Sequence, residues 1–123
     1  MSTINFSKTS SRVQNHSDEL EAYWPNLAKN DVGQWLDVSQ FSDKTIQITG
    51  TLGTGGEITV EGSLDGGTTA FTLTQADTTA FVLNALGGAA VLEAVPLIRV
   101  NATNGDGTTY LSCYIFAKAS GKR

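Results

Sequence analysis

Two glutamates four residues apart have the spacing of a catalytic pair. Glu57 and Glu61 lie in the stretch "GEITVEGSLDG", and positions i and i+4 of a β-strand face the same side of its sheet. Two carboxylates on one side could act as the acid and the base of a glycosidase. An exposed acidic strand face is far commoner than such a pair, so we expect the chain not to be an enzyme.

The stretch "GSLDGGTTAF", residues 62–71, carries a second pattern. It resembles the Asp-box of sialidase-type propellers, S-x-D-x-G-x-T-W, although Ala70 stands in place of the tryptophan. The matching positions are Ser63, Asp65, Gly67 and Thr69. A propeller repeats such a motif in several blades, whereas this chain has 123 residues and one copy. We therefore interpret Asp65-Gly66-Gly67 as a tight hairpin turn, in which glycine permits positive φ and Asp65 accepts hydrogen bonds from turn amides.

The other reactive side chains are isolated in the sequence. His16 is the only histidine and has no cysteine nearby, which argues against a zinc site. Cys113 is the only cysteine and falls in the apolar run "LSCYIF", so we expect a buried thiol and no internal disulfide. The glycine-rich turns at Asp65 and Asp106 supply too few oxygen ligands for a calcium loop. We expect neither a metal nor another cofactor.

Charge and hydropathy exclude further classes of protein. The net charge of −4 argues against nucleic acid as the principal partner. Residues 57–107 hold one base, Arg99, against six acids, whereas both ends of the chain are basic. The longest apolar stretch, residues 80–98, is interrupted by polar residues and glycines, so we expect no membrane span. The polar start has no apolar core of a signal peptide, and one unpaired cysteine suits synthesis in a reducing cytoplasm.

Alternation of apolar and polar residues predicts strands from residue 34 onward. It runs through "QWLDVSQ", "DKTIQITG", where Ile46 and Ile48 should face inward, and "GEITVEGSLDG". Glycine-rich turns are expected at residues 104–107 ("NGDG") and at Gly87-Gly88, and "AAVLEAV" is expected to be a strand despite its helix formers. About eight short strands result, which predicts an all-β fold, an antiparallel β-sandwich, jelly roll or small barrel, over residues 34–123.

Residues 1–33 show neither the period of a strand nor that of a helix. We expect an irregular, extended N-terminal arm with at most a short helix at "HSDELEAYW". Ser17 would cap this helix, and Pro25 would end it.

Aromatic residues are the best candidates for an interface. Tyr110, Tyr114 and Phe116 share one face of the last predicted strand, whose other face is also apolar. A strand that is apolar on both faces is central in a sandwich or covered by a partner. Tryptophans near the arm could anchor a further contact. The expected interface residues are Phe6, Arg12, Trp24, Trp35, Tyr110 and Tyr114.

The central part of the chain resembles the small head decoration, or cement, proteins of tailed bacteriophages. Their pattern runs SDKT-x-Q-x-x-GTFG-x-GG, then GS-x-DGGTTW, then a run ending near IRP, and finally GDGTT. The matching positions are 42–45, Gln47, 50–51, Gly53, 55–56, 62–69, 98–99 and 105–109. This chain departs from the pattern at Leu52, Ala70 and Val100, which stand for Phe, Trp and Pro and should alter packing more than fold.

The resemblance implies a β-sandwich or jelly roll that binds the outside of an assembled capsid as a homodimer or homotrimer. The implied partners are the major capsid protein and further copies of the chain. The implied location is the outer capsid surface of the virion, after synthesis in the bacterial host cytoplasm. Such a protein staples neighbouring capsid subunits against the pressure of the packaged DNA.

Two other functions are compatible with the same residues. One is a structural component of the phage tail or baseplate built on a similar sandwich. The other is a carbohydrate-binding β-sandwich module, because exposed aromatic rings on sandwiches often bind sugars. Glycan binding that is lost on mutation of Trp24 or Trp35 would favour the carbohydrate-binding function.

Overall fold

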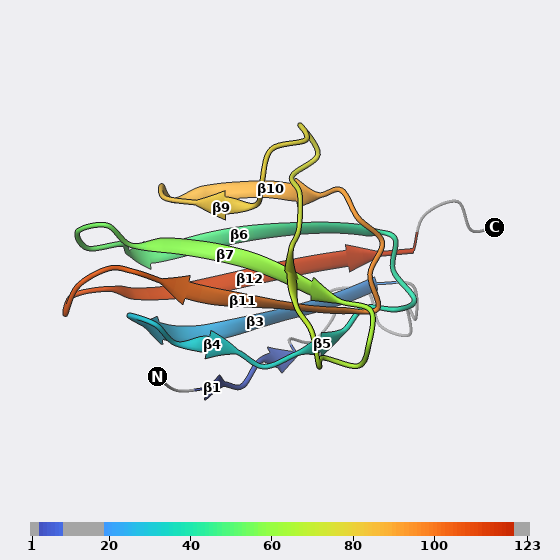
Figure 1. Cartoon of the computed structure of the whole chain (residues 1–123), viewed down its shortest axis with the longest axis horizontal. Coiled ribbons are helices and arrows are strands. Elements are labelled where there is room, and N and C mark those ends of the chain that lie inside the picture. The colour runs from blue at the N-terminus through green and yellow to red at the C-terminus, as the bar shows by residue number, and fades with distance from the viewer. Residues whose placement is uncertain (1–2, 9–18, 120–123) are drawn as a thin grey trace.

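The computed structural model describes residues 3–8 and 19–119, and every regular element in this part is a β-strand (Figure 1). The longer strands are β3 (Glu19–Ala28), β6 (Asp43–Thr51), β7 (Glu57–Ser63), β10 (Gly87–Val91), β11 (Leu97–Thr103) and β12 (Tyr110–Lys118). Two-residue strands are β1 (Thr3–Ile4), β2 (Ser7–Lys8), β4 (Val32–Gly33), β5 (Leu36–Asp37), β8 (Phe71–Thr72) and β9 (Val82–Leu83). The all-β prediction is confirmed. No helix that could cross a membrane occurs in the described residues.

The strands form two sheets. One is seven-stranded, in the order β1-β4-β11-β7-β8, with β5 paired to β11 and β9 paired to β7. The other is five-stranded, in the order β10-β6-β12-β3-β2. All pairs are antiparallel except β1 with β4, which is parallel. The expectation of antiparallel strands is therefore wrong only at this edge.

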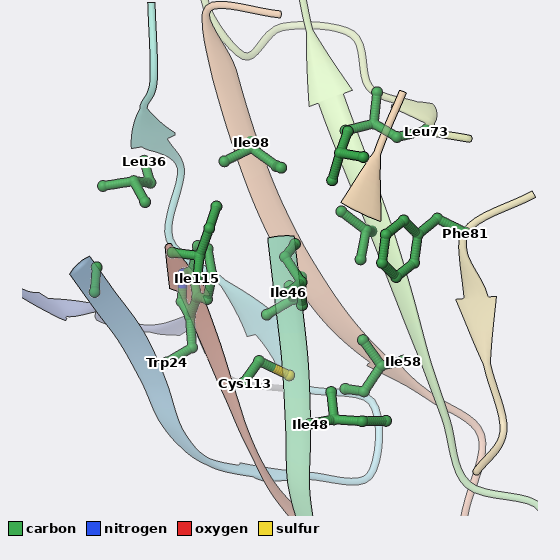
Figure 2. Packing of buried hydrophobic residues seen from close by; sticks show 14 of the residues in the cluster. Trp24, Leu36, Ile46, Ile48, Ile58, Leu73, Phe81, Ile98, Cys113 and Ile115 are labelled. Atoms are coloured by element: carbon green, nitrogen blue, oxygen red, sulfur yellow. The ribbon is translucent and has the colours of Figure 1, made fainter. Parts of the chain in front are cut away.

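The inward faces of both sheets meet in one hydrophobic core (Figure 2). Along β6, Ile46 and Ile48 are buried while Thr45 and Gln47 are exposed, as the alternation predicted. Cys113 of β12 is also buried, which confirms the expected buried thiol, and burial raises its pKa. The core contains Trp24, Ile46, Ile48, Cys113 and Ile115 from the five-stranded sheet and Leu36, Ile58, Val60, Ile98 and Val100 from the seven-stranded sheet.

Most connections between strands of different sheets are short, and the longer β7–β8 and β8–β9 connections stay within the seven-stranded sheet. The chain changes sheet after β1, β3, β5, β6, β9, β10 and β11. The expectation that the turn at residues 104–107 joins neighbouring strands as a hairpin is wrong, because the segment links β11 and β12 of different sheets. Gly87 and Gly88 open β10 instead of turning the chain, although "AAVLEAV" contains the predicted strand. Each of these strands buries one face, and two buried faces meet only when the strands lie in opposite sheets about 10 Å apart.

The second half of the expected arm belongs to the sheets. Glu19–Ala28 is the strand β3, which pairs with β12 along its length, so the expected short helix is wrong where the structure describes it. Pro25 does not end the strand because it lies opposite a register shift between Leu111 and Cys113, where no ladder hydrogen bond is required of it. Ser17, the expected cap, lies outside the described residues.

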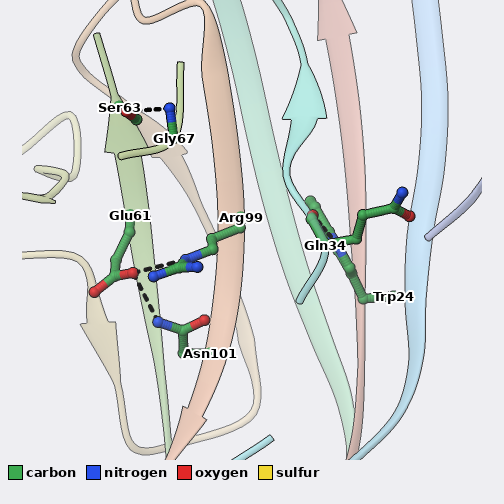
Figure 3. A network of polar contacts seen from close by, with 7 residues as sticks. All are labelled: Trp24, Gln34, Glu61, Ser63, Gly67, Arg99 and Asn101. Atoms are coloured by element: carbon green, nitrogen blue, oxygen red, sulfur yellow. Dashed lines mark hydrogen bonds and ion pairs between the residues drawn. The ribbon is translucent and has the colours of Figure 1, made fainter. Parts of the chain in front are cut away.

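Trp24 explains why this segment is a strand. Its side chain is wholly buried between the sheets, and its indole N–H donates to the carbonyl oxygen of Gln34 at 2.9 Å (Figure 3). Gly33 makes room for the ring, because a Cβ there would lie 2.9 Å from Trp24 Cδ1 and 2.6 Å from the Val100 carbonyl oxygen. As part of a strand, Trp24 buries its whole ring and keeps a hydrogen bond for its N–H, whereas in an irregular arm the ring would stay exposed to solvent.

Gly33→Ala tests this packing. The added methyl group would overlap a backbone oxygen that cannot move freely, so the free energy of unfolding should fall by about 1–3 kcal/mol. Gly107→Ala is the matched control, because a Cβ there meets nothing within 4 Å. Urea unfolding of both variants measures the difference. Equal stability of the two variants would contradict the close approach at Gly33.

Candidate interaction surfaces

The structure separates the residues expected to form an interface. Trp24 belongs to the core and cannot contact a partner. Tyr110 and Tyr114 lie on the outer side of the five-stranded sheet, with 56% and 42% of their surface exposed. Trp35 is half-buried beside the seven-stranded sheet, and Phe6 is half-buried against the core. Arg12 lies outside the described residues.

The outer side of the five-stranded sheet carries a group of aromatic rings, which we call the aromatic face. Its members are Tyr23 of β3 and Tyr110, Tyr114 and Phe116 of β12. Tyr23 and Tyr114 are paired across the two strands, and their rings stack with centroids 5.3 Å apart and planes at 15°. Such pairs add about 0.5–1.5 kcal/mol beyond their buried area. The shared outward face of Tyr110, Tyr114 and Phe116 is confirmed, whereas Tyr23 was missed because its segment was expected to be an arm.

A hollow lies beside these rings and contains few charges. Its walls include Glu21, Thr45, Gln47, Tyr114 and Phe116. Rings at a hollow edged by polar side chains form the kind of mixed surface that protein interfaces use. The aromatic face is therefore the best candidate for a protein contact.

A polar network lies on the seven-stranded sheet (Figure 3). Arg99 Nε and Asn101 Nδ2 donate to the same carboxylate oxygen of Glu61, at 2.9 and 2.8 Å. The Arg99 guanidinium also lies 4.4 Å from the centre of the Trp35 ring, a cation–π contact. Glu57 instead accepts a hydrogen bond from Asn104 at 3.3 Å. The two glutamates thus have separate partners. Glu61 is held by two side chains of β11, and Glu57 by Asn104, which directly follows β11.

The Asp-box-like stretch forms the predicted hairpin between β7 and β8. Asp65 Oδ1 accepts hydrogen bonds from the Thr69 amide and the Ser63 hydroxyl, each at 2.8 Å, and these bonds lower the pKa of Asp65. The Ser63 oxygen accepts the Gly67 amide at 2.9 Å. The loop spans residues 64–70, so it is wider than the expected tight turn. The assigned role of Asp65 as a turn acceptor is confirmed.

Asp106 locks two of the connections between the sheets. Its Oδ2 accepts the Thr54 amide at 2.9 Å, and its Oδ1 accepts the Thr108 hydroxyl and amide at 2.6 and 2.8 Å. The Thr109 hydroxyl donates to the Leu52 carbonyl oxygen at 2.8 Å. The hydrogen bonds that Asp106 accepts, the one from the Thr108 hydroxyl first and then those from the Thr54 and Thr108 amides, hold the pKa of Asp106 well below its ordinary range. The sequence indicated a turn here but not its partner across the fold.

Lys44 is a buried polar residue that the sequence analysis missed. It lies on the inward side of β6 with Ile46, and its Nζ donates to the carbonyl oxygens of Phe41 and Ser42 at 3.3 and 3.2 Å. Burial lowers the pKa of Lys44, while the charges of Asp43 and Glu93 oppose this shift. In the sequence, Lys44 stands two residues before Ile46, on the side of the predicted strand that should face inward, and this spacing could have revealed its burial. Among the described residues, no three His, Cys, Asp or Glu side chains gather as a metal site would require.

No protein-family model matches this sequence, and no curated protein is significantly similar to it. Its fold is similar to that of the SPBc2 prophage-derived protein YomS. The two chains are 13% identical with a TM-score of 0.60, over 83% of this chain and 96% of that chain. At this identity the similarity shows a shared fold.

Two further solved structures are less similar. A cupin domain from Bordetella pertussis Tohama I is 14% identical with a TM-score of 0.34, over 97% of this chain and 99% of that chain. The K1 cleaved adhesin domain of Lys-gingipain from Porphyromonas gingivalis W83 is 11% identical with a TM-score of 0.43, over 94% of this chain and 73% of that chain. Neither similarity is close enough to indicate a shared function.

Gly66→Ala and Gly67→Ala form a matched pair that tests the hairpin. Both glycines have positive φ, 79° and 95°, so alanine should cost each about 1–2 kcal/mol of strain. Only at Gly67 would the new Cβ approach another group, 2.9 Å from Trp35 Nε1. We expect Gly67→Ala to be the more destabilising by about 1 kcal/mol in urea unfolding. Equal losses would show that the Trp35 contact does not restrain the loop.

Asp106→Asn tests the lock between the two connections. Because the pKa of Asp106 is lowered from 3.8 in the folded chain, its charge stabilises the fold above that value. This stabilisation is lost as the pH falls toward the folded pKa. The wild type should melt above Asp106→Asn at neutral pH, and the gap should narrow below about pH 4. Thermal melts followed by circular dichroism measure the gap, and a gap that is constant with pH would contradict the assignment.

Proposed function

We propose that the chain is a head decoration, or cement, protein of a tailed bacteriophage. It would bind the outer surface of the assembled capsid and join neighbouring major capsid subunits. Two findings support its phage origin: the sequence resembles the decoration proteins at residues 42–56 and 62–69, and its fold is similar to that of a prophage-derived protein.

The aromatic face is the observation that carries this proposal. Tyr110 and Tyr114 stay exposed on a sheet whose opposite side is already fully packed against the core. Aromatic side chains with polar neighbours are enriched where proteins bind one another. The same outer side carries three acidic residues, Glu19, Glu21 and Asp43, against Lys118, and this acidic balance suits a contact with protein more than one with nucleic acid.

We also infer that the two sheets form a β-sandwich with jelly-roll connectivity. The distribution of strands supports this: β3, β6, β10 and β12 lie in one sheet, and β4, β7, β8, β9 and β11 lie in the other. A chain that changes sheet at most of its connections has many loops that tie the layers together. Two sheets joined by many loops resist separation under load, which suits a protein that holds neighbouring capsid subunits together.

The proposed mechanism is physical and needs no reaction. A protein that binds only the closed lattice stabilises that lattice by mass action, and each contact across a subunit boundary raises the barrier to opening. The chain would act as a homodimer or homotrimer on the virion surface, after synthesis in the host cytoplasm. Lattice symmetry would then fix its number of copies per capsid subunit.

Rebinding to stripped capsids tests the proposal. Purified protein added to particles that lack it should co-sediment with them and saturate at a fixed ratio to the capsid subunit. Tyr114→Lys should weaken this binding by at least about tenfold, because it places a charge in the aromatic contact. Leu64→Lys is the matched control, since Leu64 is 70% exposed and lies in the β7–β8 loop, away from that face.

Particles with the protein bound should also retain their DNA to a higher temperature, as measured by access of a fluorescent dye. Absence of binding to capsids, or binding only to tails, would overturn the proposal. Equal binding by Tyr114→Lys and wild type would exclude the aromatic face as the contact.

A further inference from the structure

The connection between β11 and β12 contains Asn104-Gly105, the only asparagine–glycine step in the sequence. Such a step can react internally, because glycine has no Cβ to shield its backbone nitrogen and reaches more backbone conformations than other residues. Asn104 is exposed, and its φ of 63° is followed by a φ of 112° at Gly105. The step therefore lies at the surface, within reach of water.

The side chain of Asn104 is weakly held. Its Nδ2 donates to Oε1 of Glu57 at 3.3 Å, which is longer than the usual N–H···O hydrogen bond. A bond of this length restrains the amide group little. The side-chain carbonyl carbon, Cγ, can therefore turn toward the backbone nitrogen that follows it.

Two aspartate–glycine steps in the same chain are better protected. Asp65 Oδ1 accepts two hydrogen bonds at 2.8 Å, and both carboxylate oxygens of Asp106 accept bonds in the lock between the connections. These bonds also lower the pKa of both carboxyl groups, so both stay ionised. A carboxylate resists attack by a nucleophile because it is negatively charged, whereas the amide of Asn104 is neutral.

Exposure alone does not single out Asn104. Asn84 is exposed as well, but it precedes Ala85, whose Cβ restricts the backbone and hinders attack by its nitrogen. Asn101 is buried in β11. Asn104 combines exposure, a weakly held amide and a following glycine.

We propose that Asn104 is a site of spontaneous deamidation whose products loosen the tie between the two connections. The deprotonated nitrogen of Gly105 attacks Cγ of Asn104, a bond forms between these two atoms, and the bond from Cγ to Nδ2 breaks. Nδ2 leaves as ammonia after taking protons from water, and a succinimide ring remains. Water then opens the ring at either carbonyl group, which leaves aspartate or isoaspartate at position 104. The whole reaction consumes one water and releases one ammonia.

Both products fit poorly into this connection. A carboxylate at position 104 has no hydrogen to donate to Glu57 and carries the same charge. Isoaspartate lengthens the backbone by one carbon next to Gly105, where even an added Cβ would overlap Thr109 Oγ1. That oxygen accepts the Asp106 amide at 2.9 Å, and its hydroxyl donates to the Leu52 carbonyl oxygen at 2.8 Å. Deamidation should therefore weaken the bonds between the β6–β7 and β11–β12 connections, which lie at the same end of the two sheets (Figure 1).

Ageing of the purified full-length chain tests the proposal. After incubation at body temperature in mildly alkaline buffer, tryptic peptides are analysed by mass spectrometry with fragmentation that distinguishes aspartate from isoaspartate. Asn104, in the peptide of residues 100–118, should gain the mass of one deamidation before any other asparagine does, as a mixture of both products. The rate should rise with pH, because hydroxide deprotonates the Gly105 nitrogen.

The aged chain carries one more negative charge and can be separated from the fresh chain by anion exchange. It should melt about 4 °C lower, the shift expected from a modest loss of stability in a chain of this size. Asn104→Asp reproduces one product without ageing and should also melt below the wild type. This variant tests the loosening independently of the reaction.

Asn104→Gln keeps an amide but would have to close a larger and slower-forming ring, so the mass gain at this position should disappear. Asn84→Gln is the matched control, because it changes an exposed asparagine that precedes alanine and should leave the reaction at Asn104 unchanged. Thermal melts establish that both variants fold. The comparison of Asn104 with Asn84 in the wild-type chain decides the site even where a variant does not fold.

The other outcomes would overturn the proposal. Deamidation of Asn84 before Asn104, or loss of water at Asp65 or Asp106 before either, would place the reactive step elsewhere. Deamidation of Asn104 with an unchanged melting temperature would contradict the loosening of the connections. None of these results depends on capsid binding.

Discussion

Burial of the Trp24 indole between the two sheets is the constraint on which the rest of the structure depends. The ring fills the core beside Gly33, and its N–H is satisfied by Gln34, so both sheets must meet at this point. Because side chains alternate along a strand, an inward Trp24 places Tyr23 on the outer side, where it stacks on Tyr114. The same residue therefore joins the layers and creates the aromatic face.

The two sheets differ in what they present to their surroundings. The five-stranded sheet presents aromatic rings beside polar side chains, which is the mixture of groups found at protein interfaces. The seven-stranded sheet presents a polar network, in which Glu61 accepts hydrogen bonds from both Arg99 and Asn101. Loops such as the one held by Asp106 keep these outer surfaces in fixed relation. The two sheets thus present chemically different outer surfaces.

Period-two alternation was enough to predict the strands around Ile46 and Ile48, and the apolar run around Cys113 was enough to predict its buried thiol. The alternation failed for β3 because the register shift near Pro25 interrupts the period that would have revealed a strand. Turn residues predicted where the chain bends, but the same residues serve hairpins and connections between sheets, so the partner sheet stayed hidden. The role of Asn101 could not be predicted, because it depends on a hydrogen bond to a residue 40 positions away.

A cryo-electron microscopy reconstruction of phage particles carrying this chain would show whether the aromatic face binds the capsid. We expect density for the two-sheet body at fixed positions on the outside of the head. The side bearing Tyr23 and Tyr114 should be buried against capsid protein or another copy, and the Trp24 strand should be ordered within the sheet. Density on the tail, or on the head with the aromatic face turned to solvent, would contradict it.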